Sequence, residues 1–246
     1  MAYDTVVDGN KLAAAMTATA DAIRAKTGKS ASIAWNTSTG FANAVNQIDG
    51  LLEPILEYKF EMDEDFPSEM KFHGYEIIPM GFSRKISPML KDHINKIDLS
   101  PSPNCYMIES DAFSEFSACL ELRLPEGLRD IAGNAFYRFE LLSSLVLPRS
   151  LAIYNNGAFT SMNALRTVEM HCERLMGNEM FRYCDSIESI WISDSCLGIG
   201  GRPFVGLRPN VTIYLQHPQL PSGFEPGWNQ TMGGEATVLY GQQRPW

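Results

Sequence analysis

Cysteine and histidine are the residues of this 246-residue chain that most readily supply nucleophiles or metal ligands. The chain has four histidines, which show no metal-ligand spacing. It has five cysteines, irregularly spaced and without a Cys-x-x-Cys pair: Cys105, Cys119, Cys172, Cys184 and Cys196. We therefore expect reduced, mostly buried thiols and no metal site.

Other motifs with catalytic chemistry are equally scarce. There is no Gly-x-Ser-x-Gly, no His-Glu-x-x-His and no phosphate-binding glycine loop. The glycines of "GIGGRPF", from Gly198 to Phe204, are better explained by turn geometry than by phosphate binding. The acidic run at residues 63–65 is read as a solvated loop, with weak calcium binding as the distant alternative. We predict that the chain is not an enzyme and holds no cofactor.

Two aromatic residues are the best candidates for binding. Trp191 and Tyr214 each lie between two aliphatic residues, a pattern of period two that places the aromatic on the opposite face of a strand. Three other residues occupy the same position in similar triplets, so the candidate binding face is Arg123, Val146, Glu169, Trp191 and Tyr214. Two exposed aromatics on a sheet would suit a sugar or protein contact, unless a cap or another chain covers them.

These triplets belong to a repeat. Nine residues before the first aliphatic of each triplet stands a phenylalanine, and successive phenylalanines are 23, 23, 22 and 23 residues apart: Phe113, Phe136, Phe159, Phe181 and Phe204. Five residues before each phenylalanine is a further apolar position: Ile108, Ile131, Tyr154, Met176 and Ile199. A second outward row precedes the triplets: Glu121, Ser144, Thr167, Ser189 and Thr212.

A repeat of about 23 residues predicts a solenoid with one strand per coil. The triplets would form a parallel sheet, and the phenylalanines would stack inside it as a ladder. One coil buries too few apolar side chains to offset the entropy of ordering its backbone, so the coils must stack and both ends must be capped. We expect a degenerate first strand at residues 97–99 and a last strand near residues 237–240.

The segment "AFYRFELLSSLVLPRSLAIYNNGAF" resembles the BspA-like leucine-rich repeat family. The family unit runs roughly Ala-Phe-x-x-Cys-x-x-Leu-x-x-Val-x-Leu-Pro-x-x-Leu-x-x-Ile. Cys184 occupies its cysteine position, whereas His171, Ser193 and Gln216 replace its proline. The resemblance covers about residues 96–240 and implies binding and display rather than one fixed activity.

The N-terminus has a different, helical periodicity. Leu12, Met16, Thr19 and Ile23 share one helical face, and a second helix is predicted near residues 39–48. The stretch "ADAIRAKTGKSASIAWNTSTGFANAV" resembles a helical module of phage and prophage tail-associated structural proteins, over about residues 8–50. The alternative is an amphipathic hairpin that only caps the solenoid.

The expected fold is therefore α+β: a short N-terminal helical hairpin followed by a leucine-rich-repeat solenoid. We expect an attachment module at residues 1–50, a linker and cap at 51–95, and the repeat domain with its capping strand at 96–246. The formal net charge of -9 argues against nucleic acid as the main partner, and no apolar run is long enough to span a membrane.

The predicted function is that of a virion structural protein of a bacteriophage or prophage, associated with a tail, baseplate or fibre and assembled in the host cytoplasm. Its N-terminal helices would bind other virion proteins, and its repeats would bind a host-surface glycan or protein, as a homo-oligomer in the particle. A structural decoration or assembly protein with no ligand is the alternative. A cellular adhesin is disfavoured because no signal or anchor is visible, and a glycan-acting enzyme because no paired carboxylates converge on a groove.

Overall fold

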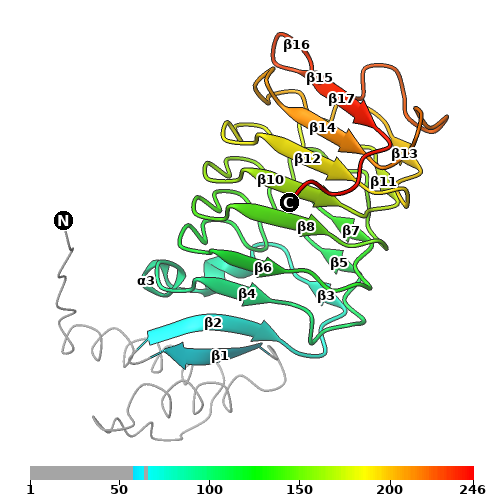
Figure 1. Cartoon of the computed structure of the whole chain (residues 1–246). Helices are drawn as coiled ribbons and strands as arrows, with labels where there is room; N and C mark the ends of the chain where they lie inside the picture. Colours follow the sequence, from blue (N-terminus) through cyan, green and yellow to red (C-terminus); the bar gives the residue numbers. More distant parts are fainter. Residues whose placement is uncertain (1–57, 64–65) are drawn as a thin grey trace, which may run out of the picture.

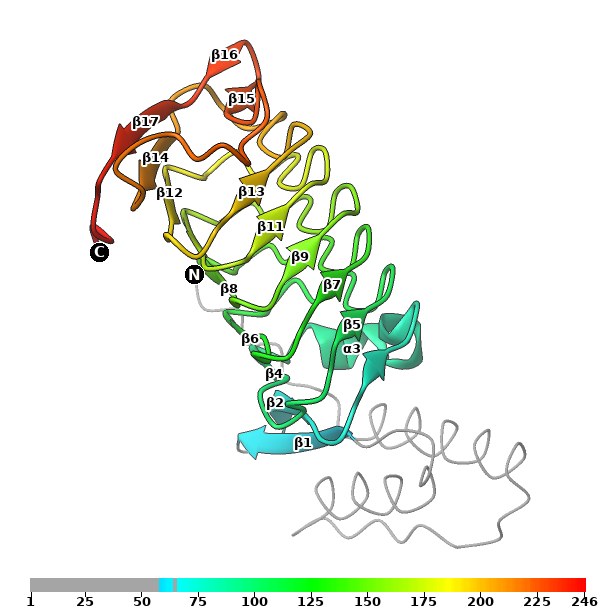
Figure 2. The same ribbon diagram turned by 90° about the vertical axis from the view of Figure 1, so that its right-hand side faces the viewer.

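The chain folds as a stack of β-coils, seen from two sides in Figures 1 and 2. The computed structural model describes residues 58–63 and 66–246, with side chains from residue 68 onward. This part is a mostly-β solenoid with one α-helix of four residues, α3 (Pro88–Lys91), and one 3-10 helix, η1 (Phe82–Lys85). The predicted N-terminal hairpin, on which the α+β class depended, lies outside the described residues.

Each coil adds one strand to a long sheet that runs along the stack (Figure 1). Hydrogen bonding divides this sheet into two ladders, with the orders β1-β2-β4-β6 and β8-β10-β12-β14-β17. All pairs are parallel except β1 with β2. The strands are β1 (Tyr58–Asp63), β2 (Phe66–Phe72), β4 (Lys96–Asp98), β6 (Glu121–Arg123), β8 (Ser144–Leu147), β10 (Thr167–Met170), β12 (Ser189–Ile192), β14 (Thr212–Leu215) and β17 (Thr237–Tyr240). The predicted parallel sheet with one strand per coil is confirmed.

A second side of each coil carries a short strand of two residues (Figure 2). These strands pair in parallel in the orders β3-β5-β7 and β9-β11-β13. They are β3 (Ile77–Ile78), β5 (Met107–Ile108), β7 (Asp130–Ile131), β9 (Ala152–Ile153), β11 (Arg174–Leu175) and β13 (Gly198–Ile199); a small hairpin, β15 (Gln230–Thr231) with β16 (Gly234–Glu235), lies near the C-terminal end.

The sequence places one position of this second sheet incorrectly in two coils. Ile153 and Leu175, rather than Tyr154 and Met176, pair with each other and are fully buried. Tyr154 is 62% exposed. In these two coils the buried aliphatic residue lies six residues before the phenylalanine instead of five. The turn between the short strand and the phenylalanine takes up the extra residue, so the phenylalanine and the triplet that follows it keep their places in the repeat.

The five repeated phenylalanines stack through the centre of the solenoid. Neighbouring ring centroids are 5.4, 5.7, 5.5 and 6.1 Å apart along the series, with interplanar angles of 8, 5, 13 and 17°. All five side chains are fully buried. Each ring therefore contacts the equivalent ring of the coil before and after it, which joins consecutive coils into one core.

The backbone around each phenylalanine links the coils as well. The amides of Phe113, Phe136 and Phe159 donate to carbonyl oxygens of the next coil at 2.8–3.1 Å. In the first four coils the residues two before and two after the phenylalanine have positive φ: Asp111, Glu115, Asn134, Arg138, Gly157, Ser161, Glu179 and Tyr183. Only one of these eight is glycine, so the inter-coil contacts stabilise a backbone conformation that L residues seldom adopt.

Aromatic residues close the ring stack at both ends. At the N-terminal end, Phe72 and Phe82 contact Phe113, with centroids at 5.3 and 5.9 Å. At the C-terminal end, Trp228 packs edge-on against Phe204 at 6.3 Å and is 4% exposed. The first and last rings are thus shielded from water, as the ends of a solenoid require.

Replacing the central ring should destabilise the whole stack. We expect Phe159→Ala to lower the free energy of unfolding by about 3–5 kcal/mol, because it removes a buried ring and leaves a cavity between two coils. Urea denaturation followed by circular dichroism would measure this. Glu188→Ala, at an exposed surface ion pair with Arg166, is the control and should change stability by less than about 0.5 kcal/mol. Equal effects of the two substitutions would contradict the role of the ladder.

Candidate functional site on the outer face of the sheet

The candidate binding residues lie in one row across the outer face of the long sheet. The register pairs Val146 with Glu169, Glu169 with Trp191, and Trp191 with Tyr214. The row continues onto Leu239 of β17. At the other end Arg123 of β6 pairs with Asp98, and Asp98 pairs with Lys71. Residues that are far apart in the sequence are therefore neighbours on the sheet, because adjacent strands lie about 4.8 Å apart.

The N-terminal half of this face is charged, with opposite signs side by side. Glu69 pairs with Lys96 at 2.7 Å and with Lys71 at 3.6 Å, and Glu121 pairs with Arg123. Asp98 is 4% exposed and accepts hydrogen bonds from the amide and hydroxyl of Ser100. These groups neutralise one another, which leaves no single sign of charge on this half.

The C-terminal half is covered, contrary to the simplest expectation from strand alternation. Trp191 is on the outer face but only 7% exposed, and Glu169 is 9% exposed. Tyr214 is half-buried, whereas Val146 is 46% exposed and Arg123 is also exposed. Alternation placed these side chains on the correct face, but it could not show that two of them are buried there.

The covering element is the chain's own C-terminal segment, residues 241–246. Figure 1 shows this red segment turning back from β17 across β14 and β12, and Figure 2 shows it on the outer side of the sheet. Trp191 Nε1 donates to the carbonyl oxygen of Gln242 at 3.3 Å. The Arg244 guanidinium is 2.6 Å from Glu169 Oε2, and the Trp246 ring packs edge-on against Tyr214 at 6.3 Å.

A histidine completes the cluster. His171 Nε2 is 2.6 Å from Glu169 Oε1, so the two oxygens of this carboxylate face two different nitrogen groups. The His171 ring also packs edge-on against Trp191, with centroids 5.3 Å apart. Glu169, His171 and Trp191 thus form one connected unit beneath the C-terminal segment, which contacts the carboxylate of Glu169 and the indole of Trp191.

The cysteines are free and buried and offer no nucleophile. Burial raises the pKa of Cys105 to about 11 and the pKa values of Cys119 and Cys184 to about 12. A hydrogen bond with Cys196 and burial raise the pKa of Cys172. Reactive cysteines have a lowered pKa and some exposure, whereas these four thiols have a raised pKa and all five cysteines are buried.

The glycine-rich stretch makes a turn whose amide is already occupied. Gly201 has φ +65°, and its N–H donates to the carboxylate of Glu225 at 3.0 Å. A Cβ on Gly200 would lie 2.5 Å from the end of the Met176 side chain and 2.7 Å from that of Glu225, so both side chains would have to move to make room for it. Close packing and turn geometry account for these glycines.

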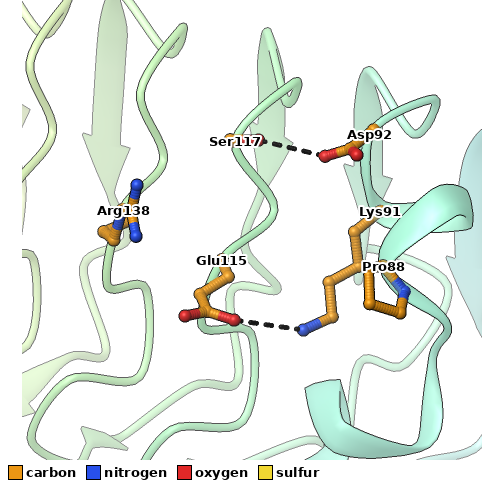
Figure 3. Close-up of a pocket in the computed structure, with 6 residues that line it drawn as sticks. All are labelled: Pro88, Lys91, Asp92, Glu115, Ser117 and Arg138. Atoms are coloured by element: carbon orange, nitrogen blue, oxygen red, sulfur yellow. Dashed lines mark hydrogen bonds and ion pairs between the residues drawn. The ribbon is translucent and has the colours of Figure 1, made fainter.

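One open pocket of about 230 Å³ lies beside α3, away from the outer row (Figure 3). It is lined by Pro88, Lys91, Asp92, Glu115, Ser117 and Arg138. Lys91 is 3.8 Å from Glu115, and Ser117 donates to Asp92 at 3.4 Å. Arg138 pairs with Glu140 at 2.9 Å. Both acidic side chains of the pocket are therefore engaged by neighbours.

Neither a membrane span nor a metal cluster is seen among residues 58–63 and 66–246. Within that part of the chain no helix has the length and apolar character needed to cross a membrane. The same residues contain no group of three or more His, Cys, Asp or Glu side chains placed to hold a metal ion.

Comparison with known proteins agrees with this architecture. Residues 90–208 match the family model described as the BspA type leucine rich repeat region, in six copies. This part of the chain is similar to the BspA-type leucine-rich repeats. The match begins a few residues before the predicted start and ends before the last coil and the C-terminal segment. Such repeats generally serve as binding surfaces or scaffolds. No curated protein sequence matches the chain.

A solved structure shares the fold. The pneumococcal vaccine antigen PcpA is similar over 75% of this chain and 44% of its own, with 14% identity and a TM-score of 0.52, so this chain spans less than half of PcpA. Two further structures are similar at lower TM-scores. A leucine rich repeat protein of T. pallidum, TpLRR, has 20% identity over 66% of this chain and 84% of its own, with a TM-score of 0.39. One from Bacteroides ovatus ATCC 8483 has 16% identity over 76% and 70%, with a TM-score of 0.40.

The buried thiols should be protected in the native protein. With pKa values of about 11 to 12, at most about one in a thousand of the Cys105, Cys119 and Cys184 thiols is ionised at pH 8, and burial shields all five cysteines from the reagent. We expect native protein to react with less than one equivalent of Ellman's reagent, and all five cysteines to react in guanidinium chloride. Rapid labelling of a native thiol would show that a coil opens readily.

Truncating the covered tryptophan should destabilise the protein. We expect Trp191→Ala to lower the free energy of unfolding by about 2 kcal/mol or more, because it removes a buried ring and the hydrogen bond to Gln242. Val146→Thr, in the same row but exposed, is the matched control and should stay within about 0.5 kcal/mol. Equal stabilities in urea would mean that the C-terminal segment does not cover Trp191 in solution.

Proposed function

We propose that this chain is a structural protein of a bacteriophage or prophage particle, associated with a tail, baseplate or fibre, that displays its BspA-like repeats for host-surface or protein binding. Residues 1–50 would attach it to other virion proteins, and several copies would assemble in the host cytoplasm and remain in the virion. The attachment role depends on the sequence resemblance of residues 8–50, which lie outside the described residues.

The observation that carries the binding role is the alignment of unlike side chains along the outer row. Successive coils present Val146, Glu169, Trp191 and Tyr214 in register, and Arg123 holds the equivalent repeat position one coil earlier. A row of this kind offers charged groups, an apolar group and aromatic rings at a regular spacing, and aromatic residues and arginine dominate the binding energy of protein contacts.

The second candidate is a decoration or assembly protein with no ligand. The burial of Trp191 under residues 241–246 favours it, because an aromatic that is already covered needs no partner. A glycan-acting enzyme has less support, since Asp92 and Glu115 of the pocket beside α3 are already paired with Ser117 and Lys91.

Deleting residues 1–50 tests the attachment role. We expect the shortened protein to keep the circular dichroism spectrum of a β-solenoid but to be absent from particles purified on a density gradient and probed by immunoblot. The full chain expressed at the same level is the control.

Each other outcome has a distinct meaning. Normal loading of the shortened protein onto particles would refute attachment through residues 1–50. Loss of the β spectrum would indicate that these residues cap the solenoid instead. A full chain absent from particles of its own phage or prophage would exclude a virion protein altogether.

A further inference from the structure

The C-terminal segment binds the sheet as a separate peptide would. Its backbone leaves the sheet after two hydrogen bonds, from Gly241 N to His217 O at 2.9 Å and from Gln242 N to Leu215 O at 3.0 Å. Gly241 has φ +67°, and no heavy atom lies within 4 Å of the position of an added Cβ. The chain therefore turns at an unhindered glycine, and beyond Gln242 it contacts the sheet through the side chains of Arg244 and Trp246.

These contacts come from alternate residues of the segment. The carbonyl oxygen of Gln242, the guanidinium of Arg244 and the ring of Trp246 each contact a different strand, at Trp191, Glu169 and Tyr214. Period two is the spacing at which an extended chain presents residues to one side. Pro245 restricts Arg244 to an extended backbone, which suits the segment for this use.

The two partners also match in chemistry. Glu169 is a carboxylate whose side chain is 11% exposed, and the arginine that reaches it is half exposed. Arginine is the side chain best suited to a fixed carboxylate, and a tryptophan ring suits the face beside Tyr214. The receiving surface is thus built into the sheet, whereas residues 243–246 are exposed and Trp246 keeps 42% of its surface in water.

We propose that the outer face of β10, β12 and β14 is a peptide-binding site for an extended segment with an arginine followed two residues later by an aromatic residue. Residues 241–246 are its intramolecular occupant and are displaced by a partner protein carrying a segment of the same chemistry. This inference depends on the proposed function, in which the repeats bind a protein, and it identifies the class of that partner.

Tethering explains why the free chain would bind such a partner weakly. A short tether holds its occupant at an effective concentration on the order of millimolar. A competitor can bind only the sites that are open at that moment, so its apparent affinity is its intrinsic affinity multiplied by the open fraction. If the untethered hexapeptide binds with a dissociation constant of about 0.1 mM, the tethered copy weakens competition roughly tenfold. Release of the segment should therefore uncover the site without any change in the sheet.

The experiment uses the full chain with Arg244→Ala and Trp246→Ala together, which removes both side-chain anchors of the segment. The probe is the peptide Gly-Gln-Gln-Arg-Pro-Trp with an N-terminal fluorophore, and the readout is fluorescence anisotropy. We expect the double variant to bind the probe about ten times more tightly than the wild-type chain. Adding Glu169→Gln should abolish that gain, and adding Val146→Thr, the control in the same row, should leave it unchanged.

Three results would overturn the proposal: no binding of the probe to the folded double variant, equal binding to the wild type, or binding that survives Glu169→Gln. If the double variant does not melt cooperatively, the single variant Arg244→Glu is tested in its place. Its new carboxylate repels Glu169 while Trp246 stays in place, so this variant should also bind the probe more tightly than the wild-type chain. Probe binding that fails while the chain still loads onto particles and adsorbs to host cells would refute only the peptide site. Loss of loading or adsorption would count against the proposed function itself.

Discussion

Contact between one coil and the next is the interaction on which the rest of this structure depends. A coil of about 23 residues cannot enclose a core of its own, so its apolar side chains are buried only when the next coil covers them. The stacked phenylalanines and the amides that donate from coil to coil make this contact the same at each step. Residues with positive φ flank the first four rings, which means that the coil conformation is stabilised by its neighbours rather than by local preference.

The same stacking creates the functional surface. Because successive coils are in register, residues 22 or 23 positions apart in the sequence become neighbours on the sheet, as Glu169, Trp191 and Tyr214 do. The surface can therefore vary from coil to coil without disturbing the core, since the outer side chains do not take part in the ladder. This separation lets one face carry paired charges near β4 and β6 and an acidic, aromatic cluster near β10 to β14.

The sequence predicts well those features that repeat and poorly those that do not. The phenylalanine period and the aliphatic triplets identify the strands β6, β8, β10, β12 and β14. The alternation along β12 assigns Trp191 to the outer face. The sequence selects Tyr154 where Ile153 is the buried residue of the second sheet. One extra turn residue lengthens the spacing from this position to Phe159, while Phe159 still lies 23 residues after Phe136, so the period gives no sign of the change. The C-terminal cover is missed for a different reason: the contact of Arg244 with Glu169 joins residues 75 positions apart, and nothing in "GQQRPW" belongs to the repeat. A lone arginine and tryptophan at a chain end carry no period from which a partner could be inferred.

The covered part of the outer row is set by the contacts of the C-terminal segment. Arg244 contacts Glu169 on β10, whereas Val146, the next residue of the row on β8, is 46% exposed. Burial of the row therefore gives way to exposure between these two strands. The covered residues have a chemistry complementary to the segment, with a carboxylate for Arg244 and aromatic rings for Trp246 and the Gln242 carbonyl. Because none of these side chains belongs to the phenylalanine ladder, either partner of each contact can be altered without changing the hydrophobic core of the solenoid.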